Sequence, residues 1–184
     1  MSVPQGLTFV DPAAVVKQLS VKPGDKIADF GSGAGYFSFE FAKQVGSDGI
    51  VYALDVLPAA LEAVVSRAKI LGLTNIVTRR VNLERENGST LGNESIDWVV
   101  LKDMLFQNQK KNIILREVMR VLKPGGRTLI MEWSVEGSLV GPEKELRISH
   151  EQMKILLEEA GFMLEREINV GGFHYAFVVK ENDK

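Results

Sequence analysis

Three glycines that alternate with other residues form the part of this chain best suited to holding a ligand. Gly31, Gly33 and Gly35 follow a short apolar run that contains Asp29, and a helical pattern begins at Tyr36. Glycine adopts positive φ readily, and because it has no Cβ a ligand can lie against its bare backbone. The segment therefore predicts a strand, a tight loop and a helix that together bind a nucleotide-like cofactor. A purely structural turn would show the same glycine pattern.

A second carboxylate follows at the distance expected for a ribose ligand. Asp55 ends the next apolar run, 24 positions beyond Gly31, where its oxygens can accept from both ribose hydroxyls. A helix-capping or solvated loop aspartate would have the same spacing. Dinucleotide enzymes use G-x-G-x-x-G, whereas here Gly35 comes one position early and Tyr36 stands in the third-glycine position. The spacing disfavours a nicotinamide-dependent oxidoreductase.

Apolar runs of strand length alternate with helical patterns along most of the chain, which is typical of a parallel sheet with helices on both faces. We expect an α/β, Rossmann-like, doubly wound sheet of seven strands, mostly parallel, with an antiparallel strand from a C-terminal hairpin through Val170-Gly171-Gly172. Residues 1–184 are expected to form a single domain, with a short N-terminal helix within 1–22. The expected strands are 26–30, 50–54, 76–81, 96–101, 128–133, 163–169 and 173–179. The expected helices are 11–19, 36–45, 57–71, 110–122 and 149–160.

Composition narrows the classes of partner. The formal net charge is −2, and basic pairs such as Arg79-Arg80 form no stripe, so nucleic acid is disfavoured. The chain has no cysteine, which excludes disulfides and thiolate metal sites, and we expect no metal. No apolar run is long enough to span a bilayer and no signal peptide is evident, so we expect no membrane insertion and a cytoplasmic protein.

Four ordered motifs resemble those of class I S-adenosylmethionine-dependent methyltransferases, most closely the ubiquinone/menaquinone-biosynthesis group. The resemblance extends from about Leu19 to Val179. The motifs are Asp29-x-Gly31-x-Gly33-x-Gly35, Val51-Tyr-Ala-Leu-Asp55, Ile96-Asp97-Trp-Val-Val-Leu101 and Leu122-Lys-Pro-Gly-Gly126. The resemblance implies S-adenosyl-L-methionine as the cofactor and methyl transfer as the reaction.

The resemblance also implies roles for individual residues. Asp29 and the loop 31–35 would hold the methionine end of the cofactor. Asp55 would bind the ribose diol, and Asn82 the adenine amino group, unless Asn82 only caps a turn. Tyr36 could place its ring near the sulfonium charge or pack in the core. The backbone of Leu101 and Lys102 would face the methionine amino group. The full set of implied cofactor-binding residues is Asp29, Gly31, Ser32, Gly33, Gly35, Tyr36, Asp55, Val56, Asn82, Leu83 and Leu101.

The acceptor side is less defined by the sequence. Methyl transfer needs alignment and exclusion of water more than a dedicated catalytic group, and a base helps only when the acceptor loses a proton. Many relatives have a histidine in the stretch that corresponds to 103–107, and this chain has none. Asp103, His150 and His174 are the candidates for a catalytic role, and each could be structural instead.

The acceptor is expected to be a small molecule of unidentified type, and the oligomeric state stays open. Relatives build a lid from an insertion after the fifth strand, and residues 134–149 are the counterpart here. The short candidate lid and the absence of the histidine leave an alternative to a catalytic function. In this alternative, the protein is a non-catalytic S-adenosylmethionine-binding subunit of a larger partner.

Overall fold

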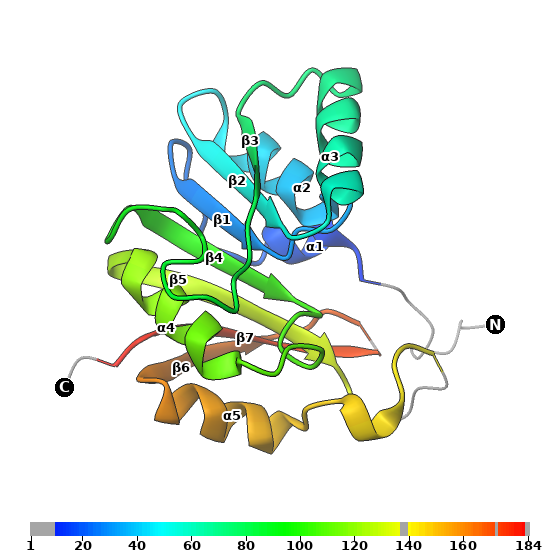
Figure 1. The fold of residues 1–184 in the computed structure, drawn as a ribbon, viewed down its shortest axis with the longest axis vertical. Coiled ribbons are helices and arrows are strands. Elements are labelled where there is room, and N and C mark those ends of the chain that lie inside the picture. The colour runs from blue at the N-terminus through cyan, green and yellow to red at the C-terminus, as the bar shows by residue number, and fades with distance from the viewer. Residues whose placement is uncertain (1–9, 137–139, 172, 183–184) are drawn as a thin grey trace.

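The computed structural model describes residues 10–136, 140–171 and 173–182. They form a seven-stranded sheet with the order β3-β2-β1-β4-β5-β7-β6, flanked by helices (Figure 1). The strands are β1 (Lys26–Phe30), β2 (Ile50–Asp55), β3 (Ile76–Arg80), β4 (Ile96–Lys102), β5 (Leu122–Trp133), β6 (Phe162–Ile168) and β7 (His174–Glu181). The helices are α1 (Pro12–Val16), α2 (Tyr36–Val45), α3 (Pro58–Ile70), α4 (Lys111–Val121) and α5 (His150–Glu159), with a 3₁₀ turn η1 (Lys144–Leu146).

The sheet has the mixed topology that the sequence predicts. Strands β3, β2, β1, β4 and β5 pair in parallel, whereas β7 runs antiparallel to both β5 and β6. The predicted hairpin therefore places its second strand between β5 and its first strand. Of the predicted turn 170–172, residue 172 lies outside the described residues.

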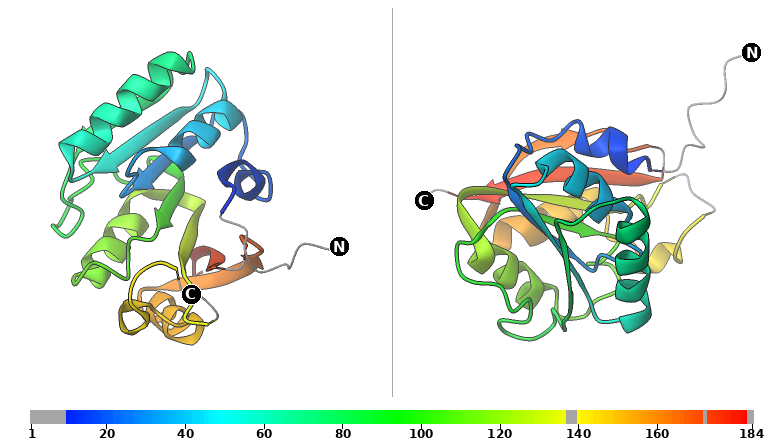
Figure 2. Two further views of the ribbon diagram at one scale, coloured as in Figure 1. Left: turned by 90° about the vertical axis from the view of Figure 1, so that its right-hand side faces the viewer. Right: turned by 90° about the horizontal axis from the view of Figure 1, so that it is seen from above.

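Helices cover both faces of the sheet (Figure 2). On one face, α1 and α2 pack Val15, Phe37 and Phe41 into one core cluster, and α3 packs against α2 and β2. On the other face, α4 and α5 bury Ile114 and Leu157 in a second cluster. None of the helices among the described residues has the length and apolar character to cross a membrane.

Local signals fix several element boundaries. Asp11 caps α1 by accepting from the Ala13 amide at 2.9 Å, with proline at the first helical position. The predicted capping box of α5 is present, because Ser149 accepts from the Gln152 amide and the Gln152 side chain accepts from the Ser149 amide. Gly46 ends α2 at a positive φ of 67°.

One boundary differs from the sequence prediction. The segment 123–126 does end α4, but β5 already begins at Leu122, so the Pro-Gly-Gly run lies inside the strand. Pairing with β4 jumps there from Ile96↔Leu122 to Trp98↔Arg127, which is a bulge. The Lys123 ammonium group donates to both carboxylate oxygens of Asp97 at 2.7 Å, and these bonds join β5 to β4 at the bulge. The Pro-Gly-Gly run thus lies in a bulge of β5 and also follows the end of α4.

The strand order reverses between β1 and β4, which are neighbours with crossovers leading away on opposite sides. Ligands of doubly wound sheets bind outside the carboxyl ends of the strands at such a reversal. The carboxyl ends of β1, β2 and β4 belong to residues 30, 55 and 102, and the predicted cofactor-binding residues Gly31, Asp55 and Leu101 lie at or next to them.

Candidate active site

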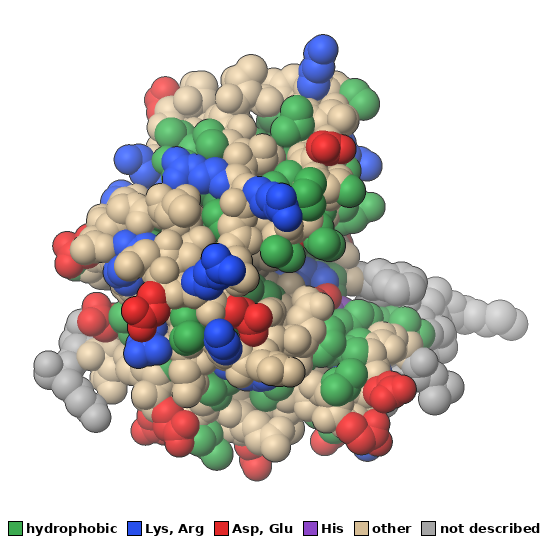
Figure 3. Space-filling model, in the orientation of Figure 1, with side chains coloured by type: hydrophobic (Ala, Val, Ile, Leu, Met, Phe, Trp, Pro, Cys, Tyr) green, Lys and Arg blue, Asp and Glu red, His purple; other side chains and the backbone are tan. Residues whose placement is uncertain are grey.

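A cavity of about 1100 Å³ lies at this edge of the sheet. Its walls come from the loops after β1, β2, β3 and β4, from the end of β5 and from the start of β7. In the space-filling view, hydrophobic side chains gather on both rims of the notch at the right of the molecule (Figure 3). Most of the predicted site residues line it, namely Asp29, Gly31, Ser32, Gly33, Tyr36, Asp55, Val56, Asn82, Leu83, Asp103 and His174.

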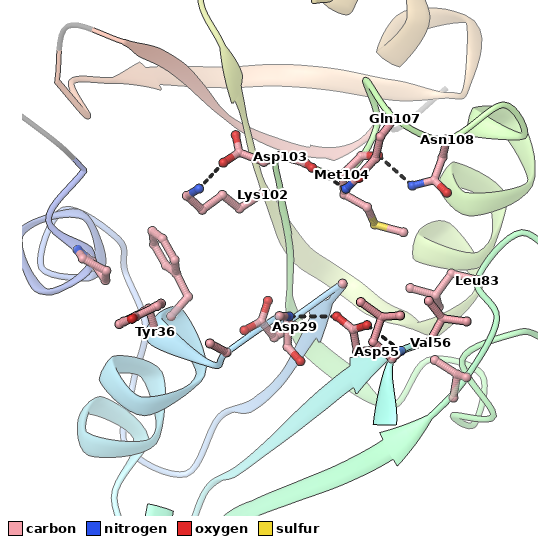
Figure 4. A pocket seen from close by; sticks show the side chains of 18 of the residues that line it. Asp29, Tyr36, Asp55, Val56, Leu83, Lys102, Asp103, Met104, Gln107 and Asn108 are labelled. Atoms are coloured by element: carbon pink, nitrogen blue, oxygen red, sulfur yellow. Dashed lines mark hydrogen bonds and ion pairs between the residues drawn. The ribbon is translucent and has the colours of Figure 1, made fainter. Parts of the chain in front are cut away.

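Asp55 connects the glycine loop to the start of α3. One carboxylate oxygen accepts from the Gly33 amide at 2.8 Å and the other from the Leu57 amide at 2.9 Å. The side chain is nearly buried, yet it lines the cavity (Figure 4). Asp55 therefore closes a local turn before α3 without capping the helix, and it also holds the glycine loop in position beside the ligand space.

Asp29 lies deeper, at the end of β1. It is 3% exposed and accepts from the Ser38 hydroxyl at 2.6 Å. Burial raises the pKa of Asp29 to about 6, against the opposing effect of the Ser38 hydrogen bond. A cationic ligand group beside Asp29 would favour the ionised carboxylate.

The three glycines of the loop have different physical roles. All have positive φ, at 72° for Gly31, 51° for Gly33 and 79° for Gly35. A Cβ on Gly33 would meet nothing within 4 Å, a Cβ on Gly31 would lie 3.3 Å from Met104, and a Cβ on Gly35 would lie 2.8 Å from Val64. Gly31 and Gly33 line the cavity and Gly35 does not. Gly35 is required for the close packing of α2 against α3 rather than for space beside a ligand.

This difference predicts opposite phenotypes for two alanine variants. Gly35→Ala should lower the free energy of unfolding by about 2 to 4 kcal/mol, because it combines positive φ with a steric clash. Gly33→Ala should cost only about 1 kcal/mol of stability. It should nevertheless weaken binding of S-adenosylhomocysteine at least tenfold, because its methyl group enters the space beside the loop.

Urea unfolding and calorimetric titration measure the two effects. Gly24→Ala is the matched control, since Gly24 has φ 86° and open space around it but lies outside the cavity. Equal cofactor affinities for the Gly33→Ala and Gly24→Ala variants would contradict the assignment of Gly33 to the cofactor wall.

An apolar slot follows Asp55 at the other end of the cavity. Val56 and Leu83 line it, with Met104 nearby (Figure 4). Val56 is 53% exposed and Leu83 is buried, as expected for two sides of a slot open to a flat ring. Asn82 also lines the cavity, and its side-chain oxygen accepts from the Glu84 amide at 3.0 Å. Asn82 therefore caps a turn and is also one of the residues that line the cavity.

Three predicted residues lie elsewhere. Leu101 is fully buried in a core cluster and Gly35 packs between helices, so neither lines the cavity. His150 begins α5, where it lies 3.1 Å from Glu167 and packs edge-on against Phe177, outside the cavity wall. Because α5 covers one face of the sheet, the start of this helix does not reach the cavity.

Comparisons with known proteins agree with this geometry. Residues 21–168 match the profile of the methyltransferase domain family. The chain belongs to this family. The ubiquinone/menaquinone biosynthesis C-methyltransferase of Haemophilus ducreyi is 35% identical over 116 residues, which cover 62% of this chain and 43% of that protein. The corresponding protein of Paraburkholderia xenovorans is 34% identical over 65% of this chain and 47% of its own length. The chain thus spans less than half the length of these relatives.

A solved structure is similar over almost the whole methyltransferase domain. The SAM-dependent methyltransferase of Aquifex aeolicus superposes with a TM-score of 0.86 at 27% identity, covering 96% of this chain and 93% of that one. A type 11 methyltransferase from Sulfolobus solfataricus has the same fold, with a TM-score of 0.75 at 18% identity. These findings confirm the predicted resemblance to class I S-adenosylmethionine-dependent methyltransferases and the predicted fold class.

The charges of the cavity fit the cofactor of this methyltransferase family. Among the described lining residues are the carboxylates of Asp29, Asp55, Glu84 and Asp103 and one cationic side chain, Lys102. Lys102 is itself paired with Asp103 (Figure 4). A pyrophosphate would be repelled by such a wall, whereas a sulfonium and an ammonium group are attracted.

The methyltransferase cavity has a second polar end that sequence analysis located only in part. Asp103 follows β4 with φ 51°, its amide donating to the Met131 carbonyl at 2.9 Å. Its carboxylate bridges Lys102 and His174, and the Nε2 atom of His174 lies 3.0 Å from Asp103 Oδ1. The pKa of Asp103 is lowered, because its two basic neighbours outweigh the opposing and largest effect, desolvation. Asp103 and His174, two separate candidates in the sequence, are therefore neighbours.

Three side chains at this end were missed, because the sequence analysis considered only the backbone of Lys102. Lys102 and Trp133 line the cavity, and the Trp133 ring packs against His174 at a tilt of 38° with ring centres 4.1 Å apart. Glu132 is completely buried and accepts from the amides of Met104, Leu105 and Phe106, so it fixes the loop after Asp103. A carboxylate between the apolar residues Met131 and Trp133 was the available signal for Glu132.

The candidate lid, residues 134–149, is described except for 137–139. Arg147 is 8% exposed and donates to the carbonyls of Ser134, Val140 and Pro142 at 2.7–2.9 Å. Gly141 lies against the Trp133 ring, since a Cβ there would come within 2.5 Å of it. Arg147 therefore joins Ser134 to Val140 and Pro142 within this segment, and a lid function stays a prediction.

Proposed function

We propose that this protein transfers a methyl group from S-adenosylmethionine to a small-molecule acceptor. The observation that carries the proposal is one cavity in which Asp55 positions the glycine loop and carboxylates outnumber cationic side chains among the described lining residues. When bound, S-adenosylmethionine supplies a methyl group already activated by its sulfonium. The chain then needs to align the acceptor with that methyl group and to exclude water.

Different parts of the cavity would bind different groups of the cofactor and the acceptor. Val56 and Leu83 would contact adenine, Asp55 would accept from the ribose hydroxyls, and Asp29 would attract the cationic methionine end. Placed in this way, the cofactor leaves the end with Lys102 and Asp103 for the acceptor, across the cavity from Asp29 (Figure 4). Tyr36, 60% exposed, would then border the reacting centre and not the core.

Calorimetric titration with S-adenosylhomocysteine and with NAD tests the cofactor part of the proposal. We expect saturable, one-to-one binding of S-adenosylhomocysteine and none of NAD, because carboxylates outnumber cationic side chains among the described lining residues and would repel a pyrophosphate. Formation of S-adenosylhomocysteine from S-adenosylmethionine in the presence of small acceptors tests the transfer itself. Failure to bind S-adenosylhomocysteine, or binding of NAD in its place, would refute the proposal.

A further inference from the structure

Glu84 is a cavity-lining carboxylate that joins the loop after β3 to the loop after β4. Its Oε1 atom accepts from the backbone amides of Gln109 and Lys110, at 3.0 and 3.1 Å. Glu84 is half-buried and lines the cavity. The two loops are 25 residues apart in the sequence, so local chain geometry alone does not bring them together. The Glu84 side chain is therefore a link between two separate parts of the cavity wall.

A tight turn, residues 82–85, sets the position of Glu84. The Asn82 side-chain oxygen accepts from the Glu84 amide at 3.0 Å, and the Asn82 carbonyl accepts from the Arg85 amide at 3.3 Å. A turn closed by an Asn side chain has a defined backbone conformation. Asn82 and Leu83 line the part of the cavity to which the proposed function assigns adenine. A cofactor that packs against them contacts the same turn that carries the Glu84 side chain.

On the other side of the link, the segment 103–110 forms the wall that runs from the acceptor end of the cavity toward the adenine end. Asp103 and Asn108 lie on opposite sides of the close view of this wall (Figure 4). The Gln107 side chain donates to the Asp103 carbonyl at 2.8 Å, and the Asn108 side chain donates to the Met104 carbonyl at 2.7 Å. These bonds join the two halves of the segment, so we expect it to be ordered or displaced as a unit.

Two carboxylates of the described residues attach the segment 103–110 to the rest of the protein. Glu132 accepts from the amides of residues 104–106 at one end, and Glu84 accepts from those of residues 109 and 110 at the other. Glu132 is completely buried and does not line the cavity, whereas Glu84 does. The attachment through Glu84 is therefore the one that a ligand in the cavity can strengthen.

We infer that Glu84 is a positioning residue that couples the adenine end of the cavity to the acceptor wall. This inference rests on the proposed methyl transfer and adds an order of binding to it. A cofactor packed against Asn82 and Leu83 restrains the turn that carries Glu84. Glu84 in turn restrains the segment 103–110 in the conformation that forms the acceptor wall. The acceptor therefore binds more tightly to protein that already holds the cofactor, and bound acceptor tightens the cofactor by the same factor.

A merely structural role for Glu84 predicts a different behaviour. Lys110 immediately precedes α4 and makes no side-chain cap, so a carboxylate beside this helix N-terminus would favour the helix in any case. Loss of such an anchor would loosen the segment 103–110 equally with and without cofactor. Loss of a coupling residue instead removes the response of the segment to the cofactor.

Hydrogen–deuterium exchange of backbone amides, followed by NMR, measures this response without any acceptor. The reporter is the Asn108 amide, which donates to the Leu105 carbonyl at 3.3 Å and not to Glu84. We expect saturating S-adenosylhomocysteine to slow its exchange about tenfold in the wild-type protein. Glu84→Ala should abolish the slowing while S-adenosylhomocysteine still binds in calorimetric titration. Glu84→Gln should retain part of the slowing, because its side-chain oxygen can still accept from both amides.

Glu86→Ala is the matched control, because Glu86 is an exposed glutamate of the same loop that does not line the cavity. This variant should show the full slowing. Wild-type protein that binds S-adenosylhomocysteine without slower exchange at Asn108 would overturn the coupling and leave the proposed methyl transfer standing. Slowing of the wild-type size in Glu84→Ala would do the same. If the wild-type protein bound no S-adenosylhomocysteine, the proposed methyl transfer itself would fail, and the coupling with it.

Discussion

Replacing Asp55 with alanine should weaken binding of S-adenosylhomocysteine by about 100-fold, or roughly 3 kcal/mol, because the variant loses charged acceptors for two ribose hydroxyls. The amide of Gly33 also loses its partner at 2.8 Å, so the glycine loop becomes less ordered before the cofactor arrives. The loss of the ribose acceptors and the loss of order in the loop both weaken the binding of S-adenosylhomocysteine. Calorimetric titration of the wild-type and Asp55→Ala proteins measures their sum.

Asp25→Ala is the matched control for Asp55→Ala, because it also removes a carboxylate that accepts from a backbone amide. Asp25 accepts from the Lys22 amide at 2.8 Å in a turn outside the cavity, so its removal costs a cap without touching the cofactor. We expect this variant to be somewhat less stable and to bind S-adenosylhomocysteine normally. If Asp55→Ala also bound normally, Asp55 would be a structural cap of Gly33 and Leu57 and the ribose would lie elsewhere.

The cofactor half of the site could be predicted because its signals are local. A strand, a glycine loop and a helix are contiguous in sequence, and Asp55 ends the next strand at the same edge of the sheet. What spacing could not show is the reason for each glycine. Gly33 leaves space for a ligand and Gly35 leaves space for Val64, and only the packing of α3 against α2 distinguishes the two.

The acceptor half could not be assembled from the sequence because its parts come from three strands. His174 meets Asp103 only because β7 inserts antiparallel beside β5, which brings its first residue to the carboxyl edge next to Trp133. The sequence predicted the hairpin but not the order of its strands in the sheet. The same uncertainty kept His150 among the candidates, although α5 places it away from the cavity.

Glu132 should make the stability of this protein fall as the pH rises toward 8. Burial raises the pKa of Glu132 to about 8 from an ordinary value of 4.5, so the folded protein holds a proton that the unfolded chain has already released. The stabilisation is complete below the unfolded pKa and is lost as the pH approaches the folded pKa. The expected loss from this residue is about 2 kcal/mol over the last two pH units before 8.

Urea unfolding of the wild-type and Glu132→Gln proteins across this range isolates the effect. Glutamine retains an oxygen for the amides of Met104 and Leu105 but cannot ionise, and its extra N–H groups lack partners beside the unpaired Oε2 position. The variant should therefore be less stable near pH 6, by about 1 to 3 kcal/mol. The difference should shrink or reverse as the pH rises, because only the wild-type protein then has to ionise a buried group.

Glu117→Gln is the control with the opposite electrostatics. Glu117 is also buried, at 3% exposed, but Arg120 and Ser89 donate to it and lower its pKa despite burial, so it is ionised throughout this range. Its glutamine variant should lose a constant amount of stability at every pH from 6 to 9. Parallel stability curves for wild-type and Glu132→Gln would show that Glu132 is already charged when folded. The loop after Asp103 would then be held by a carboxylate anion, and the environment of His174 would contain a second negative charge.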